Sequence, residues 1–580
     1  MTISCVWDLH RGDYDDNRTS PRGRGLRSVV LSAVLEFNYL TAPLAFLALV
    51  LGPTLLLGIA PSAAITAAHL MYQTAFLSGS GLIVALSIFI VLVLLALRIG
   101  RPLLAMAFAE FRHLHYSLVF PIFVAVREIV HSLLESFGGE TMTPLQLDRR
   151  RRIGTVLAML LFAGAGLALA LSVEFSTGLK LVNVARVQLW VSIKAALGNA
   201  ALIIGVSTVL ESFYWMWREL TLGGPVLDWI PSHSQGTPVR VAHLSDLHLV
   251  GERYGYRMEA GTLGPRGNGC ILSALRKLAA LQKSAPLDRI LVTGDVTDAG
   301  TRAEWAEFVD LFREFPELQA RLSFVPGNHD VNIVDRTNPA RLDLPWSSSQ
   351  WLRKLRVVLA LDAIQGERAH IVDRASGTVG PSLHDYLREG KRLERLRALA
   401  GRGTILGRRE MAKTWEAIFP LVEPAPNAGG YGLILLDSNA QSHFSLTNAL
   451  GVVNPSQLRA LKSVLRNSIG RSWIVLLHHA IVEYPCVSMR LRDRIGLALV
   501  NAPDIVATIA PYAARVLVFH GHRHKDWIGT CGEVVLCSAP SAALGSDEHE
   551  EFEGQFHIHE LTLTASGGIL LGPTQHVKAA

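Results

Sequence analysis

The sequence contains few cysteines and few charged residues. Its five cysteines are an odd number and include no C-x-x-C pair, which argues against a disulfide framework and a zinc knuckle and fits a reducing compartment. Only 18% of the 580 residues are charged, whereas 50% are hydrophobic, a balance typical of membrane proteins. The chain is also too long for one ordinary domain, so we expect two parts.

The C-terminal part lacks basic clusters. From residue 238 onward, 38 Lys and Arg residues stand against 35 Asp and Glu residues, with no Lys/Arg run and no interleaving of aromatic and basic residues. We therefore expect no docking of nucleic acid, although nucleic acid stays open as a substrate. A cleaved signal peptide is not expected either, because the N-terminus is polar and Arg-rich and the first long apolar run begins late.

The apolar residues concentrate between residues 39 and 217. This region predicts about four transmembrane helices, with residues 1–38 as a tail and 218–237 as a linker. The four apolar runs lie at about 39–60, 81–98, 153–172 and 193–215. The connection at 98–152 holds an apolar stretch broken by charges, at 101–137, which indicates an amphipathic helix at the membrane surface.

Arginine is distributed unevenly around these runs. The tail has five Arg residues and the 98–152 connection has eight, including RRRR at 149–152. The positive-inside rule places both regions in the cytoplasm, and four spans return the chain there. We therefore expect a multi-pass protein of the cell (inner) membrane with a cytoplasmic domain at 238–575. No run has a clear central charge, so the region is interpreted as an anchor rather than a transporter.

The C-terminal part alternates short β-branched runs with helical patterns, which predicts an α/β sandwich with its site at the carboxyl ends of the strands. The strands are expected at about 238–244, 288–293, 321–325, 431–436, 472–477, 514–519 and 533–538. The helices are expected at about 270–284, 301–314 and 455–468.

Polar side chains follow five of the expected strands. The blocks are D-L-H at 246–248, G-D at 294–295, G-N-H-D at 327–330, H-H at 478–479 and H-G-H-R-H at 520–524. Asp, Asn and His gathered at one edge form a mixed oxygen and nitrogen ligand set suited to Mn, Fe or Zn and large enough for two ions. Asp8 and His10 repeat the D-x-H spacing without a β-α pattern after them, and we interpret them as part of a solvated tail.

The five blocks resemble the calcineurin-like metallophosphoesterase family, whose pattern is D-x-H, G-D, G-N-H-[DE], H and G-H-x-H. The resemblance covers residues 238 to about 565 and implies a four-layer α-β-β-α sandwich. The stretches HLSDLHL and GDVTDAG look like the class III cyclic-nucleotide phosphodiesterase branch. Protein Ser/Thr phosphatases carry G-D-x-V-D-R-G instead, and Thr297 and Ala299 depart from that pattern.

Carried over to this sequence, the resemblance implies two divalent ions. One would be held by Asp246, His248, Asp295 and His524, and the other by Asp295, Asn328, His478 and His522. Of the neighbours His478 and His479, the first matches the family pattern, and the choice between them stays open.

The same family pattern suggests a proton donor beside the ligands. His329 would protonate the leaving group, with Asp330 orienting its ring. The alternative role for His329 is purely to support a metal ligand.

These features predict a membrane-anchored, metal-dependent phosphoester hydrolase, and within that class a phosphodiesterase. Its substrate would be a cyclic nucleotide, another phosphodiester or a lipid-linked phosphate, and its partner the lipid bilayer, whose anionic headgroups would suit the Arg-rich connection. One alternative is a pyrophosphatase acting on a nucleotide-activated lipid. Another is a non-catalytic metal-binding sensor domain. The long segment at 335–425 is expected to form a cap over the cleft.

Overall fold

The computed structural model describes most of the C-terminal part and several helices of the N-terminal part. The described ranges are 42–44, 46–52, 54–59, 120–137, 144–173, 189–221, 225–226, 236–252, 255–257, 265–334, 341–343, 347–427, 429–443, 445–468, 470–482, 497–544 and 554–579. These residues form two compact units, one within residues 33–221 and one from residue 222 onward.

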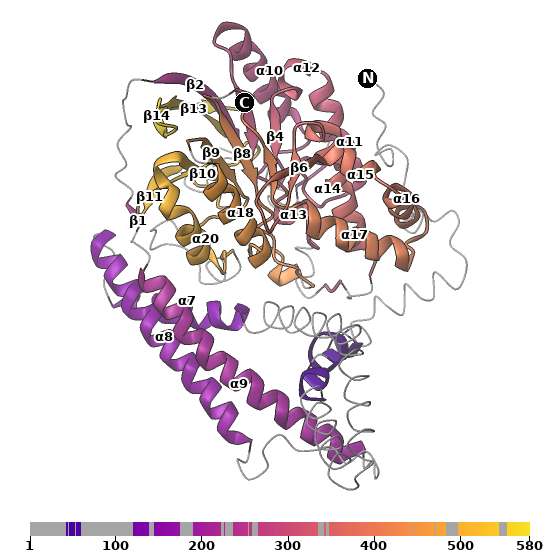
Figure 1. Ribbon diagram of the computed structural model, residues 1–580, viewed down its shortest axis with the longest axis vertical. Helices are drawn as coiled ribbons and strands as arrows, with labels where there is room; N and C mark the ends of the chain where they lie inside the picture. Colours follow the sequence, from indigo (N-terminus) through magenta and orange to yellow (C-terminus); the bar gives the residue numbers. More distant parts are fainter. Residues whose placement is uncertain are drawn as a thin grey trace, which may run out of the picture. The chain divides into compact units, whose positions relative to one another are not determined.

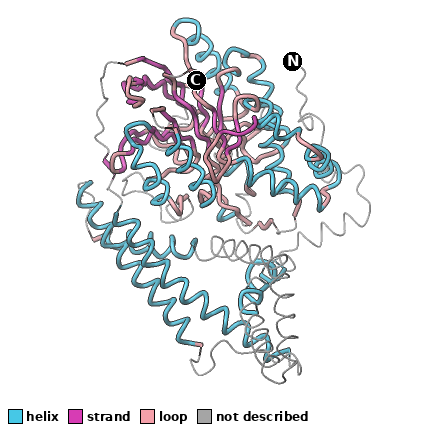
Figure 2. The backbone as a smooth tube through the Cα atoms, viewed as in Figure 1, coloured by secondary structure: helices cyan, strands magenta, loops and turns pink. Residues whose placement is uncertain are grey.

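The first unit is helical (Figures 1 and 2). Its longest elements are α7 (Phe120–Ser136), α8 (Pro144–Ser172) and α9 (Leu189–Thr221). Helices α8 and α9 run antiparallel, because the side chains of Thr155 and Glu219 meet near one end and Gly166 meets Gly205 farther along. A Cβ atom added to Gly205 would lie 2.6 Å from the carbonyl oxygen of Gly166, so this close approach requires glycine.

Two helices in the described part of the chain are long and apolar enough to cross a membrane, Gln146–Ser172 and Ile193–Thr221. They contain the apolar runs expected at 153–172 and 193–215. The expected run at 81–98 lies outside the described residues, as does the Asp8–His10 pair. The run at 39–60 is described only in part and includes a π-helix at Leu47–Leu51. The prediction of four spans is therefore not confirmed.

The second unit is built on two mixed sheets (Figure 1). The nine-stranded sheet has the order β1 (Pro225–Val226), β11 (Trp527–Cys531), β12 (Val534–Ser538), β10 (Val516–His520), β9 (Ser472–Leu476), β8 (Tyr431–Leu435), β7 (Leu421–Glu423), β5 (His370–Val372) and β6 (Val379–Ser382). The five-stranded sheet has the order β14 (Ile569–Lys578), β13 (Gln555–Leu563), β2 (Thr237–Leu244), β3 (Arg289–Val292) and β4 (Leu322–Phe324). Each strand expected from the sequence is present.

Alternating side chains place the nine-stranded sheet between two apolar layers. Ile474 and Leu476 of β9 join the main core together with residues of the other sheet, such as Phe556. Val475 of β9 faces the opposite way and packs with α18 (Pro455–Asn467) and α20 (Ala502–Ile509). Helices α10 (Gly269–Ser284) and α11 (Arg302–Arg313) also contribute to the main core. The two sheets thus form the interior of an α/β sandwich.

Much of the segment expected to cap the cleft is built into this domain. Strands β5, β6 and β7 belong to the nine-stranded sheet, and α14 (Ser349–Gln365) contributes Leu352, Leu355 and Leu359 to the main core. The rest of the segment consists mainly of α15 (Leu383–Arg388), α16 (Arg392–Arg402) and α17 (Ile405–Ile418). The segment therefore extends the sandwich and completes its interior.

Candidate metal centre

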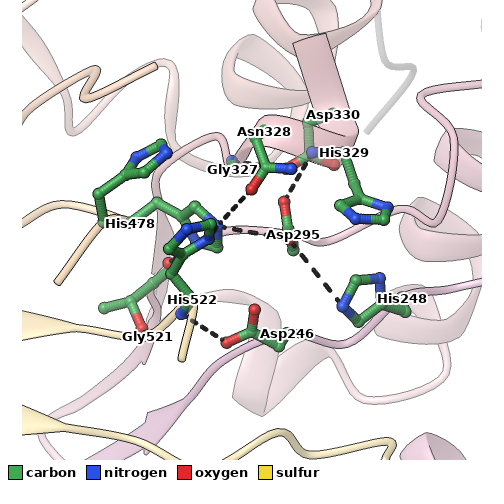
Figure 3. A network of polar contacts seen from close by, with 12 residues as sticks. Asp246, His248, Asp295, Gly327, Asn328, His329, Asp330, His478, Gly521 and His522 are labelled. Atoms are coloured by element: carbon green, nitrogen blue, oxygen red, sulfur yellow. Dashed lines mark hydrogen bonds and ion pairs between the residues drawn. The ribbon is translucent and has the colours of Figure 1, made fainter. Parts of the chain in front are cut away.

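The polar strand ends come together at one edge of the sandwich. Strands β2, β3 and β4 are parallel neighbours in one sheet, and β8, β9 and β10 are parallel neighbours in the other. The expected ligands follow these strands, with Asn328 at the start of α13 (Asn328–Val331). Figure 3 labels all of them except His524, and the labelled side chains point toward one another, as the sequence predicts for a shared site at these strand ends.

The backbone at this edge is held in an unusual conformation. Among the described residues, the non-glycine positions with positive φ are Asp246 (52°), His248 (43°), Asp295 (47°), His522 (70°) and His524 (50°). All five are expected ligands. Left-handed backbone at such residues costs of the order of 1–3 kcal/mol each and persists where surrounding contacts enforce it. Here the N–H of Asp246 donates to the carbonyl of Gly294 at 3.0 Å, and that of His248 donates to the carbonyl of Asp295 at 2.9 Å.

The first group of candidate ligands consists of His478 Nε2 and three polar atoms around it. Its Nδ1 donates to the carbonyl of Thr293 at 2.8 Å, so Nε2 is the ring nitrogen that faces the site. That Nε2 lies 3.1 Å from Asn328 Oδ1, 3.3 Å from Asp295 Oδ2 and 3.0 Å from His522 Nδ1. Two imidazole nitrogens and two oxygens converging in this way match the ligand set expected for one ion.

The second group lies on the other side of Asp295. His524 Nε2 is 3.2 Å from Asp246 Oδ1, and His248 Nε2 is 3.9 Å from the same Asp295 Oδ2 that faces His478. Both ring nitrogens of His248 are buried and make no hydrogen bond with the described residues, although carboxylate oxygens of Asp298 and Asp295 lie 3.4 and 3.9 Å away. Buried polar atoms are rarely left in this state, so the site fits a cation that would bind them.

The electrostatics of the centre favour ionised carboxylates. Burial alone would raise the pKa of Asp295, but His478 and His329 outweigh it and hold that pKa well below the usual range. For His478 the opposite balance holds, because Asp295 overcomes burial and raises its pKa to about 9. A bound cation would take the place of the proton on His478, since a ligating histidine is neutral.

The structure distinguishes His478 from its neighbour His479. The ring of His479 pairs with the hydroxyl of Ser438, with 2.9 Å between His479 Nδ1 and Ser438 Oγ. The same hydroxyl oxygen accepts the backbone N–H groups of both histidines, at 3.2 and 3.1 Å. This geometry favours His478 as the ligand and gives Ser438, which the sequence did not single out as a site residue, a part in holding the turn.

His329 lies beside the ligands, and its ring is fixed by a group that we had not expected. Its backbone N–H donates to Asp295 Oδ1 at 2.8 Å, and its Nδ1 lies 2.7 Å from the carbonyl oxygen of Asp298. Because a carbonyl oxygen only accepts, Nδ1 carries a proton and Nε2 is the ring nitrogen left for exchange.

The hydrogen bonds of the Asp330 carboxylate go to two loops of the site. Its carboxylate accepts hydrogen bonds from the backbone of Val296, Thr297 and Gly327 and from the Thr297 hydroxyl, at 2.6–3.2 Å. These bonds join the loops after β3 and β4. Burial, followed by the charge of Asp295, raises the pKa of Asp330 to about 6. Its observed role is to lock the two loops together.

Asp298 is the residue that sequence reasoning missed. It is buried, its carbonyl holds His329, and its carboxylate Oδ1 lies 3.4 Å from His248 Nδ1. A carboxylate behind a ligating histidine fixes the orientation of the ring and raises its basicity. The signal was present as the second Asp of GDVTD, three residues after Asp295.

Comparison with known proteins agrees with this geometry. Residues 239–526 match the family model described as calcineurin-like phosphoesterase. Over 104 residues, which are 18% of this chain and 37% of the relative, the sequence is 27% identical to a probable cyclic nucleotide phosphodiesterase of Coxiella burnetii. The chain thus spans little more than a third of that relative's length. The family match supports a metal-dependent phosphoester hydrolase.

Several solved structures also resemble the chain. A dimetal phosphatase from Danio rerio has a TM-score of 0.33 at 12% identity, covering 59% of this chain and 99% of its own. A putative 5′-nucleotidase from Staphylococcus aureus has a TM-score of 0.31 at 11% identity, covering 59% of this chain and 54% of its own. A purple acid phosphatase from yellow lupin has a TM-score of 0.30 at 10% identity, covering 60% and 53%.

Proposed function

Residues 239–526 are a calcineurin-like metallophosphoesterase domain, and from that premise we propose that the protein is a two-metal phosphodiesterase anchored in a membrane. One ion would be held by Asp246, His248, Asp295 and His524. The other would be held by Asp295, Asn328, His478 and His522. The observation that carries the proposal is the position of Asp295 Oδ2, which lies 3.3 Å from His478 Nε2 and 3.9 Å from His248 Nε2 and so belongs to both groups.

The residues of this chain divide the work of hydrolysis. Bound divalent cations would supply Lewis acidity toward the phosphoryl oxygens and make water nucleophilic at neutral pH. His329 would give the leaving alkoxide a proton from Nε2, since its Nδ1 is committed to the Asp298 carbonyl. Asp298 positions both His329 and His248, and Asp330 holds together the loops after β3 and β4, which carry Asp298 and His329.

A diester is the favoured substrate class. The relative from Coxiella burnetii is named as a probable cyclic nucleotide phosphodiesterase, and the sequence blocks around Asp246 and Asp295 resemble the cyclic-nucleotide branch of the family. Cyclic nucleotides are therefore the first natural substrates to test. A pyrophosphatase acting on a nucleotide-activated lipid would use the same cations and the same proton donor, so the assay below includes such a substrate.

The anchor would be formed by the helical unit. Helices α8 and α9 are long enough to cross a bilayer, and many of their large apolar side chains are exposed, including Leu160, Leu161 and Leu210. The N-terminal part of α8 carries Arg149–Arg152, which would remain at the cytoplasmic surface. This arrangement would leave the phosphoesterase domain on the cytoplasmic side.

The activity is tested with detergent-purified protein and Mn²⁺. Bis-p-nitrophenyl phosphate, p-nitrophenyl phosphate, cyclic nucleotides and a nucleotide-diphosphate lipid would be compared. We expect turnover of the diester, and we expect the Asp295→Asn variant to lose more than about 10²-fold, because changes behind a ligand already cost 10–100-fold. Full activity in Asp295→Asn protein with wild-type circular dichroism would refute the shared ligand. Two bound ions without turnover of any substrate would favour the sensor alternative.

The membrane placement has a separate test. Phosphatase reporters fused after residues 75 and 230 would report which side of the membrane each position occupies. We expect only the first reporter to lie outside the cytoplasm. The reverse pattern, or release of the protein from membranes by alkaline extraction, would refute the anchor as proposed.

A further inference from the structure

A second histidine cluster lies between the two sheets, apart from the strand-end centre. His243 of β2 and His557 and His559 of β13 are all completely buried. One ligand atom from each of the three lies within 4.8 Å of the others. The ring centroids are separated by 6.3, 5.6 and 5.3 Å, so the three imidazoles surround one point.

Strand register explains why these rings meet. His557 of β13 pairs directly with His243 of β2 on one side and with His576 of β14 on the other. Directly paired residues point to the same face of a sheet, and so does His559, two residues along β13. This face looks toward the other sheet, because Phe519 of β10 stacks on the rings of His243 and His559 at 4.8 and 5.0 Å.

The hydrogen bonds leave each ring with a nitrogen to spare. His243 Nε2 pairs with the Thr293 hydroxyl at 3.0 Å, and His559 Nδ1 pairs with the Thr574 hydroxyl at 2.8 Å. The remaining nitrogens, His243 Nδ1 and His559 Nε2, are buried and make no hydrogen bond with the described residues. His557 Nδ1 is in the same state, whereas His557 Nε2 faces a carboxylate. Such a concentration of unpaired polar atoms between two sheets is unfavourable unless something binds them.

The Asp526 carboxylate lies between the buried cluster and the solvent-exposed His576. Asp526 Oδ1 lies 3.1 Å from His557 Nε2, and Asp526 Oδ2 lies 2.7 Å from His576 Nδ1. The His557 Nδ1 atom is then left for the inner cluster. Carboxylate–histidine pairs of this kind orient metal-ligating rings. The Asp526 and His576 side chains are 31% and 52% exposed, so they form the outer rim of the site.

We propose that His243, His557 and His559 form a third metal site, a tris-histidine site for Zn²⁺, separate from the strand-end centre. Three neutral imidazoles are a ligand set that Zn²⁺ takes with nitrogen–metal distances of about 2.0–2.1 Å. Asp526 positions His557 from the rim, and the Thr293 and Thr574 hydroxyls fix the other two rings. None of its three ligands belongs to the proposed catalytic groups, and Thr293 contacts both sites, with its hydroxyl at His243 and its carbonyl at His478.

The test separates this site from the strand-end centre by removing two ligands of the latter, His478 and the shared Asp295. Full-length Asp295→Asn/His478→Asn protein would be loaded with Zn²⁺, freed of excess metal and measured by inductively coupled plasma mass spectrometry. We expect one ion per chain to remain. Adding His559→Gln should remove that ion, whereas adding His576→Gln, on the same row of the sheet but at the rim, should leave it. Cobalt(II) in place of Zn²⁺ should give the visible absorption of a four-coordinate ion in the same variants.

Two results would overturn the proposal. One is the absence of a retained ion in Asp295→Asn/His478→Asn protein whose circular dichroism matches the wild type. The other is an ion that persists when His559 is replaced. If the His559→Gln variant fails to fold, His243→Gln replaces it with the same expected loss. Loss of the third ion with unchanged diester turnover in an otherwise wild-type background would confirm that the two sites are separate.

Discussion

An ion pair of the helical unit and the candidate metal centre of the phosphoesterase domain hold their charged groups in different ways. In the helical unit, Arg127 on α7 pairs with Glu219 on α9, with 2.5 Å between Nη1 and Oε1. The Thr155 hydroxyl donates to the same carboxylate at 2.9 Å, and His131 Nε2 lies 3.1 Å from that hydroxyl. In the phosphoesterase domain, both ring nitrogens of His248 are buried with no hydrogen bond to the described residues.

This difference distinguishes structure from function. A partly buried ion pair that takes part in further hydrogen bonds holds helices in register. Buried ligand atoms without partners are stable only when a further group binds them. Replacements in the first region should therefore change stability, and replacements in the second should change metal binding and turnover.

His329→Gln should have the largest effect of the replacements outside the ligand set. Losing the proton donor should lower turnover by about 10²–10⁴-fold while the metal content stays the same. The loss should be greater for cyclic nucleotides, which release an alkoxide, than for bis-p-nitrophenyl phosphate, whose leaving group needs little protonation. Equal losses for both substrates would show that His329 only supports its neighbours, and loss of metal would make it a ligand.

Asp298→Asn should have an intermediate effect. It keeps the backbone carbonyl that holds His329 but removes the charge 3.4 Å from His248 Nδ1. Metal affinity should fall by about 10–100-fold, and excess Mn²⁺ should restore most of the turnover. Asp310→Asn, which alters an exposed ion pair on α11, serves as the matched control and should change neither quantity. Unchanged metal affinity in Asp298→Asn would remove Asp298 from the site.

Glu219→Gln should have the smallest effect of the three replacements. Turnover per bound metal ion should be the same as in the wild type. Its carboxylate accepts from Arg127 and Thr155, so the replacement should destabilise the helical unit by about 1–3 kcal/mol, measured by thermal unfolding in detergent. Arg127→Met together with Glu219→Leu should not recover that loss, because the buried Glu128 carboxylate would lose the hydrogen bond that it accepts from Arg127 Nε at 2.9 Å. If turnover per bound metal ion fell together with the stability of the helical unit, the proposal that the two units act independently would be wrong.

The strand-end centre was readable from the sequence because its ligands stand in short blocks directly after apolar runs. Parallel strands end at one edge, so blocks far apart in the chain, such as those at Asp246 and His522, were expected to meet, and they do. What the blocks do not encode is the direction of each side chain. Asp298 and Asp330 lie in the neighbouring loops after β3 and β4. Only the three-dimensional course of the backbone shows that Asp298 contacts His248 and His329.

Two other features could not be predicted from the sequence, the buried face of α14 and the tris-histidine cluster. Helix α14 reads ambiguously because Arg353, Lys354 and Arg356 are buried with the leucines. Arg353 Nε donates to the carbonyl of Val331 and Arg356 to that of Gly300, each at 3.0 Å, so these charges pack inside without an apolar pattern to announce them. The tris-histidine cluster was hidden for a different reason, since pairing between β2 and β13 is a matter of register and not of spacing.

Strand β2 has a consequence for the inheritance of both polar clusters. His243 lies inside the strand, while Asp246 and His248 follow directly beyond its end. Inserting or deleting one residue within β2 would turn His243 to the opposite face and shift the two residues beyond it along the chain. Both clusters would be lost in one mutational event. Relatives that retain both clusters should therefore keep β2 at constant length, and any differences in length should lie in their loops.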